Sequence, residues 1–312
     1  MPVPHRLVTR SDFDGLVCAV LLRELGLVGE ILFVHPKDVQ DGKVAVTRND
    51  ILTNLPYVPE AHLVFDHHSS EALRNGAPRP NHVLDPAAPS AARVVFDHYG
   101  GAARFPGISE ELMSAVDQAD SAQYALEDVL RPTGWALLNF LMDSRTGLGR
   151  FRDFRVSNYD LMMMLIDEVS GKSAGEVLML PDVAERVDLY LAQQPEFLRQ
   201  LKRCSTVMGE LVVLDLRDED VIHAGNRFAI YALHPECTVS VHVLWGKQQQ
   251  NTVLAVGKSI LNRASGVDIG ALMLSYGGGG HANAGTCQVE HQDADRTLLE
   301  IAAHVNATVG VK

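Results

Sequence analysis

The stretch from Leu63 to His68 constrains the fold most, because a short apolar run leads directly into acidic and imidazole side chains. The apolar residues 63–65 suit a buried strand, and Asp66, His67 and His68 follow at once. Open parallel sheets collect polar groups in this way at the carboxyl ends of their strands, where ligands bind. Taken alone, the stretch fits a turn with two surface histidines equally well. Further acidic groups that follow apolar runs favour a ligand site.

One such group lies near the amino terminus. Asp12 and Asp14 follow a predicted strand over 6–9 and precede a predicted helix over 16–26 that ends on a glycine. Two carboxylates two residues apart at the mouth of a strand can face one centre. A helix cap would explain only one of them.

Three later aspartates extend this pattern. Asp50 comes shortly after the strand-like run 43–47, so we expect it where a strand stops. Asp117 and Asp120 lie near the end of a predicted helix over 110–119 and share one helical face. The sequence does not decide which of the two points inward.

The order of predicted elements indicates an α/β protein with two domains. Strands and helices alternate first, which predicts a parallel sheet with helices on both faces. Helices follow, and they end in a long helix over 183–204 that we expect to be broken or bent at Pro195. Strand-like runs at 211–214, 228–232, 239–244 and 252–256, with a helix over 267–275, predict a smaller mixed-sheet α/β domain. We expect the first domain over 1–182, a connecting helix over 183–205 and the second domain over 206–312.

The second domain carries four successive glycines, Gly277 to Gly280, followed by His281. Glycines let backbone amides approach a ligand closely. A flexible linker also uses glycines, but an apolar helix and the run 281–285 bound this one, which favours an anion-binding loop.

Charge and hydropathy limit the classes of molecule that this chain is expected to bind. The net charge of −12 in 312 residues argues against binding of long nucleic acid, whereas a phosphorylated substrate remains compatible because bound cations supply a local positive field. No apolar run could cross a bilayer, and the amino terminus lacks the apolar core of a signal peptide, so we expect a cytoplasmic protein without membrane contact. A homodimer is the common state of such enzymes.

The acidic and imidazole side chains that follow the predicted strands and helices form a hard oxygen and nitrogen ligand set. Such a set suits two divalent cations, Mn²⁺ or Mg²⁺. Two such ions can bind a phosphoryl oxygen and activate a water that attacks phosphorus. The set comprises Asp12, Asp14, Asp50, His67 and one of Asp117 and Asp120.

With these motifs in this order, the chain resembles the DHH phosphoesterase family with its associated carboxyl-terminal domain. The resemblance spans nearly the whole chain, from the acidic motif at 12–15, through Asp50, the triplet 66–68 and a later aspartate, to the glycine motif at 278–281.

The resemblance implies a role for each residue. Asp50 would bridge two metals; Asp14, His67 and Asp120, with Asp117 as the alternative, would complete one metal site, and Asp12 would serve the other. His68 would contact the scissile phosphate and Asp66 would orient the imidazoles. Arg263, Gly278, Gly279, Gly280 and His281 would bind the distal part of the substrate, in a cleft between the domains.

One position departs from the family pattern. Many members carry a histidine two residues before the first aspartate, and this chain has Arg10 there. Arginine stays protonated and cannot ligate a metal. The first metal site is therefore a ligand short: it binds metal more weakly, or water or substrate takes the place, or Arg10 holds a phosphate.

Family substrates include short oligoribonucleotides, cyclic dinucleotides and their linear products, bisphosphorylated adenosine and polyphosphate. A nucleotide or short oligonucleotide fits first, because the acidity of the chain disfavours the long basic channel that polyphosphate requires. An exopolyphosphatase-like enzyme is the second candidate. A phosphate-ligand-binding protein that has lost catalysis through Arg10 is the alternative of a different class.

Overall fold

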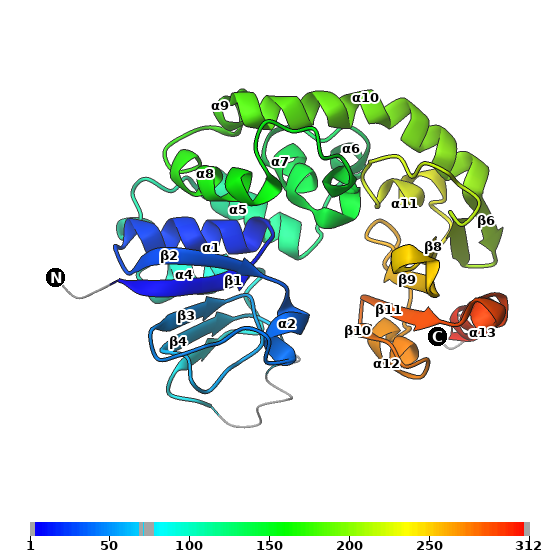
Figure 1. Ribbon diagram of the computed structural model, residues 1–312, viewed down its shortest axis with the longest axis horizontal. Helices are drawn as coiled ribbons and strands as arrows, with labels where there is room; N and C mark the ends of the chain where they lie inside the picture. Colours follow the sequence, from blue (N-terminus) through cyan, green and yellow to red (C-terminus); the bar gives the residue numbers. More distant parts are fainter. Residues whose placement is uncertain (1–3, 69–70, 72–77, 309–312) are drawn as a thin grey trace. The chain divides into compact units, whose positions relative to one another are not determined.

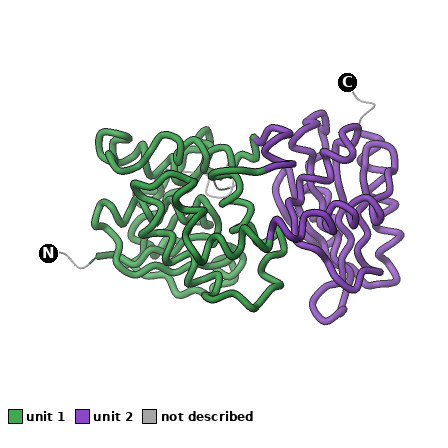
Figure 2. The backbone as a smooth tube through the Cα atoms, turned by 90° about the horizontal axis from the view of Figure 1, so that it is seen from above, with its two compact units in different colours: residues 1–123, 132–189 green, residues 124–131, 190–312 purple. Residues whose placement is uncertain are grey.

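The structure, a computed structural model, describes residues 4–68, 71 and 78–308. Figure 2 shows that the chain divides into two compact units: unit 1 contains residues 1–123 and 132–189, and unit 2 contains residues 124–131 and 190–312. The division falls inside one long helix, α10 (Pro181–Cys204), whereas the sequence predicts boundaries at 182 and 205. The helix is expected to be broken or bent at Pro195; it continues through this residue and is therefore not broken there.

Unit 1 is built on a five-stranded sheet of order β2-β1-β3-β4-β5 (Figure 1). Every neighbouring pair runs parallel, which confirms the predicted α/β class. The strands are β1 (His5–Arg10), β2 (Val28–Val34), β3 (Asp50–Thr53), β4 (Leu63–Asp66) and β5 (His82–Leu84).

Successive strand residues point to opposite sides of this sheet. Because both sets of side chains include apolar residues, helices cover both faces. Val8, Leu52 and Val64 cluster with Val39 of α2 (Pro36–Gln40) on one face. On the other face, the ring of Phe65 lies 5.2 Å from that of His98 in α4 (Ala91–His98).

Helix α1 (Phe13–Glu24) is buried along most of its length, which explains its almost uninterrupted apolar sequence. It packs against α4, α5 and α8. Unit 1 also contains the helices α5 (Glu110–Asp120), α7 (Gly134–Met142), α8 (Asn158–Glu168) and α9 (Ala174–Leu178).

The strand predicted over 43–47 is wrong. This segment is irregular, and its side chains are exposed or half-buried. The true strand, β3, begins at Asp50, and its four residues are all buried. Alternating apolar residues in a surface loop imitate a half-buried strand, and sequence periodicity cannot distinguish the two.

Unit 2 contains a mixed six-stranded sheet of order β10-β11-β9-β8-β7-β6. Only the β7–β8 pair runs parallel within it. The strands are β6 (Ser205–Met208), β7 (Leu211–Asp215), β8 (Val239–Trp245), β9 (Thr252–Lys258), β10 (Gly279–His281) and β11 (Ala284–Val289).

The main core of unit 2 lies between one face of this sheet and two helices, α12 (Ile269–Leu274) and α13 (Ala294–Thr308). The short helices α6 (Leu126–Leu130) and α11 (Ala229–Leu233) also belong to this unit. The apolar run 228–232, predicted as a strand, is therefore mostly helix α11, since so short a buried run has no distinctive period. Among the described residues, no helix has an apolar stretch long enough to span a bilayer.

Candidate active site

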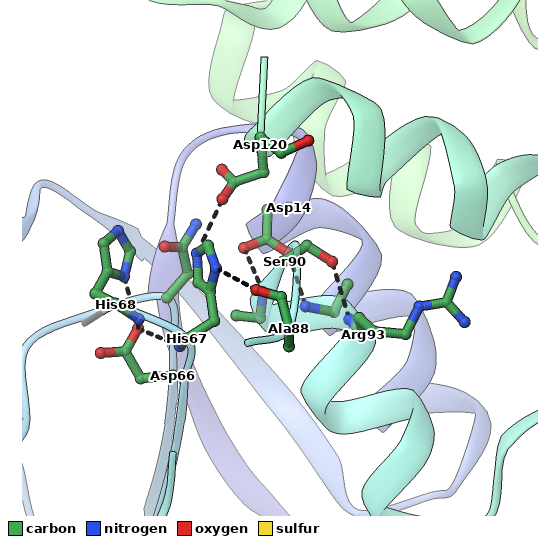
Figure 3. Close-up of polar contacts among 12 residues, drawn as sticks. Asp14, Asp66, His67, His68, Ala88, Ser90, Arg93 and Asp120 are labelled. Atoms are coloured by element: carbon green, nitrogen blue, oxygen red, sulfur yellow. Dashed lines mark hydrogen bonds and ion pairs between the residues drawn. The ribbon is translucent and has the colours of Figure 1, made fainter. Parts of the chain in front are cut away.

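Three side chains that are distant in sequence meet at the carboxyl edge of the unit 1 sheet. Asp14 lies in the first turn of α1, His67 directly follows β4, and Asp120 is the last residue of α5. One ligand atom from each lies within 4.8 Å of the other two (Figure 3). We call these three residues the ligand cluster.

Asp14 is buried and faces the start of another helix. Its carboxylate accepts hydrogen bonds from the amides of Ala91 (3.0 Å) and Ala92 (2.7 Å), the first residues of α4. Burial and the neighbouring Asp120 carboxylate raise the pKa of Asp14 to about 8, although His67 opposes them. The carboxylate therefore sits where a cation would be favoured.

His67 presents one ring nitrogen to the cluster. Its Nδ1 lies 3.3 Å from the carbonyl oxygen of Ala88, which fits a donated hydrogen bond and would leave the lone pair of Nε2 pointing the other way. Nε2 lies 2.9 Å from Oδ2 of Asp120, but the contact lacks hydrogen-bond geometry, so this buried atom has no hydrogen-bond partner among the described residues.

The charges around His67 favour a positive centre. Burial opposes its imidazolium, but Asp120 beside the ring, with Asp14 and Asp66, outweighs burial and raises the pKa of His67 to about 9. A divalent cation satisfies the same carboxylates more completely than one proton. The buried, unbonded Nε2 and the two carboxylates therefore fit a divalent metal ion.

Asp66 holds the adjacent histidine. Its buried Oδ1 accepts hydrogen bonds from the amide of His67 (2.9 Å) and from Nδ1 of His68 (2.7 Å). Burial lowers the pKa of His68, but the Asp66 carboxylate more than offsets this, and the net shift is upward. The arrangement thus orients His68 and favours its protonated form.

Asp12 lies beside the cluster and is already well paired. It caps α1 by accepting from the amide of Gly15 (2.9 Å), and its Oδ2 lies 2.8 Å from Nε of Arg10. Burial raises its pKa, and the Arg10 guanidinium opposes this. The side-chain nitrogen of Asn54 lies 3.3 and 3.4 Å from the two carboxylate oxygens.

Asn54 belongs to the site and is missed by sequence reasoning. It directly follows β3, is 1% exposed, and has a left-handed backbone (φ 54°), which asparagine tolerates. The signal that could have found it is its place after the apolar run 51–53, which matches the place of Asp66 after β4. The incorrect prediction of a strand over 43–47 leaves 51–53 unassigned, so this correspondence is not visible from the sequence.

Asp50 does not join the cluster. It begins β3, and since all five strands are parallel, it lies at the edge of the sheet opposite to the ligands. There its carboxylate binds Arg6 through Nε (2.7 Å) and Nη2 (2.9 Å) and accepts from the amide of Thr47 (2.6 Å). The expectation that Asp50 bridges two metals is therefore incompatible with this structure.

Asp117 and Asp120 have separate partners. Asp117 accepts from Ser90 Oγ (2.7 Å) and from Nε and Nη2 of Arg93 (2.9 and 2.6 Å), which ties α5 to α4. Asp120, three residues later, reaches His67. The structure thus brings Asp120, not its alternative, to the cluster.

The glycine run of unit 2 has a packing role in the structure. A side chain at Gly278 would lie 2.2 Å from the carbonyl oxygen of Thr286 in β11, and one at Gly280 would lie 2.3 Å from that of Ala284. Gly279 has no atom within 4 Å of such a position. His281 ends β10 and accepts from the amide of Asn283 (3.3 Å), and Nε of Arg263 donates to the carbonyl of Ile260 (3.1 Å).

Comparison with solved structures gives a strong match. The solved structure of PggH, described as a pGpG-specific phosphodiesterase from Vibrio cholerae, is 58% identical and superposes with a TM-score of 0.85, covering 97% of this chain and 99% of PggH. No family model and no curated protein sequence matches.

Weaker structural matches include RecJ and CDC45. RecJ from Thermus thermophilus, solved in complex with Mn²⁺, is 17% identical with a TM-score of 0.46, covering 97% of this chain and 52% of RecJ. CDC45 from Entamoeba histolytica is 8% identical with a TM-score of 0.48, covering 96% of this chain and 95% of CDC45.

Proposed function

The chain belongs to the DHH phosphoesterase family, and we propose that within it this hydrolase cleaves linear dinucleotides, with pGpG as its preferred substrate. The observation that carries the proposal is the 58% identity with a pGpG-specific phosphodiesterase over 97% of this chain. Water would add to the bridging phosphorus and the bond to the 3′ oxygen would break, which releases two molecules of GMP.

In the proposed mechanism Asp14, His67 and Asp120 hold Mn²⁺ or Mg²⁺. Such an ion supplies Lewis-acid polarisation of a phosphoryl oxygen and a water of lowered pKa. The Nδ1 contact to Ala88 fixes the ring of His67 so that Nε2 faces the ligand position.

His68 would bind the scissile phosphate. Asp66 keeps its imidazole oriented through the 2.7 Å contact and favours its charged form, which can donate a charge-assisted hydrogen bond to a phosphate oxygen. We propose that Arg263, His281 and the backbone around Gly279 recognise the distal nucleotide. The nucleotide substrate supports a cytoplasmic location.

The test is a panel assay in Mn²⁺ with pGpG, pApA, a short RNA, bisphosphorylated adenosine and polyphosphate. We expect pGpG to be cleaved with a kcat/KM at least about tenfold above that of the other compounds, and Asp120→Asn to abolish this cleavage. Preference for another compound would contradict the substrate assignment. Tight pGpG binding with no turnover would instead identify a binding protein.

A further inference from the structure

We propose that this active site holds one divalent cation rather than two, and that the Arg10 guanidinium takes the place of the second cation. The scissile phosphate would then lie between the metal at the ligand cluster and Arg10. In naming a phosphate as the shared ligand, this inference rests on the proposed function.

The first step is the ligand inventory. Among the described residues, only Asp14, His67 and Asp120 bring at least three metal-ligating side chains together. The two-cation site that the resemblance implies shares one carboxylate between ions about 4 Å apart. The residue expected to be shared, Asp50, lies at the opposite edge of the sheet and is bound to Arg6.

The second step concerns Asp12, the remaining carboxylate next to the cluster. Both of its oxygens are engaged: Oδ1 by the amide of Gly15 and Oδ2 by Nε of Arg10. A cation there would have to displace the guanidinium or lie against it, and guanidinium does not lose its proton. The positive charge opposite Asp12 is therefore supplied by the chain itself.

The third step concerns Asn54. In the strand order β1-β3-β4, this residue directly follows the middle strand and so lies between Asp12 and Asp14, which follow β1, and His67, which follows β4. A carboxylate in that position could bridge two ions. Asparagine is uncharged and offers a single carbonyl oxygen, because its nitrogen faces Asp12, so it lacks the second, anionic oxygen that a bridging carboxylate supplies.

Arg10 and Asn54 have the same electrostatic consequence. A second divalent ion needs negative charge, whereas Arg10 adds a positive charge and Asn54 supplies none. The Arg10 side chain is 35% exposed, so its remaining donors can reach a phosphate while Asp12 fixes its Nε. The result is a site with one exchangeable and one permanent positive centre.

Metal binding tests the inference without substrate. We expect equilibrium dialysis to give one tightly bound Mn²⁺ per chain, with the electron paramagnetic resonance spectrum of an isolated ion. The double variant Arg10→His with Asn54→Asp should bind a second Mn²⁺ and show exchange coupling between the ions. Arg104→His, an exposed arginine away from the site, serves as the matched control. Two coupled ions in the wild-type chain would overturn the proposal, whether or not pGpG is its substrate.

Inorganic phosphate tests the role of Arg10. We expect Arg10→Ala to raise the inhibition constant of phosphate about tenfold without weakening Mn²⁺ binding. Unchanged phosphate inhibition in a variant that still binds Mn²⁺ would exclude Arg10 from phosphate binding. Circular dichroism of each variant verifies its fold.

Discussion

Arg6 holds Asp50 through two hydrogen bonds at the amino edge of the unit 1 sheet, with Nε 2.7 Å from Oδ1 and Nη2 2.9 Å from Oδ2. Arg6 and Asp50 lie near the amino ends of the parallel strands β1 and β3, whereas Asp14 and His67 follow the carboxyl ends of β1 and β4, at the opposite edge of the sheet. The pair therefore ties β1 to the start of β3.

Asp50→Asn should therefore lower stability and spare activity. We expect the free energy of unfolding to fall by about 2 kcal/mol, since hydrogen bonds to a charged group are lost, and kcat to stay within about twofold of wild type. Urea denaturation and the pGpG assay measure the two effects. Loss of activity in a folded variant would restore Asp50 as a catalytic residue.

Asp117→Asn and Asp120→Asn should separate structure from metal binding. The first removes the charge that Arg93 and Ser90 bind, and should cost about 2 kcal/mol of stability. The second removes a cluster ligand and should weaken Mn²⁺ binding by at least about tenfold. Calorimetric titration with Mn²⁺ and urea denaturation distinguish them, and the opposite pattern would make Asp117 the ligand.

Removal of the metal should destabilise the folded chain. An ion that binds only the folded state at 100 times its Kd adds about 2.7 kcal/mol, because it neutralises the carboxylates that otherwise repel each other at the cluster. We expect EDTA to lower Tm and Mn²⁺ to restore it. Asp120→Asn should lose this response, and the exposed-site variant Asp38→Asn should keep it.

Asp66→Asn should change the pH profile. The Asp66 carboxylate raises the pKa of His68, so the imidazolium persists to higher pH in the wild-type chain. Without that charge the pKa falls, and the alkaline limb of kcat/KM should move to lower pH. Mn²⁺ affinity, measured alongside, distinguishes this from loss of metal. An unmoved limb would mean that His68 does not act as an imidazolium.

Gly278→Ala and Gly279→Ala form a matched pair in unit 2. Alanine at 278 would overlap the β11 backbone and should cost about 1–3 kcal/mol of stability. Alanine at 279 meets open space, so it should leave stability nearly unchanged but raise KM if substrate approaches this backbone. An unaltered KM for Gly279→Ala would exclude such an approach.

Much of the candidate site follows from one rule of sheet topology. Asp14 and His67 come just after apolar strands, and parallel strands bring their carboxyl ends to one edge. The sequence alone does not distinguish Asp117 from Asp120. Helical spacing places both on one face of the helix but does not specify a tertiary partner such as Arg93. That partner lies 24 residues away in sequence.

The error at Asp50 shows where local reasoning stops. The loop 43–47 has the alternation of a strand, and the true strand β3 is only four residues long. When residues 43–47 are taken as the strand, Asp50 is placed after its carboxyl end, at the edge of the ligands. In the structure Asp50 begins β3, and Asn54 is the residue that follows its carboxyl end. The register of β1 with β3 shows that Asn54 is the residue that faces Asp12.

All three members of the ligand cluster belong to unit 1. Substitutions in unit 2 therefore leave all three of these metal-ligating side chains in place. If unit 2 recognises the distal nucleotide, as proposed above, substitutions there would change the nucleotide preference while the metal ligands are kept. For the same reason, a chimaera that keeps unit 1 and borrows unit 2 from a relative is a rational starting point for new substrate preferences.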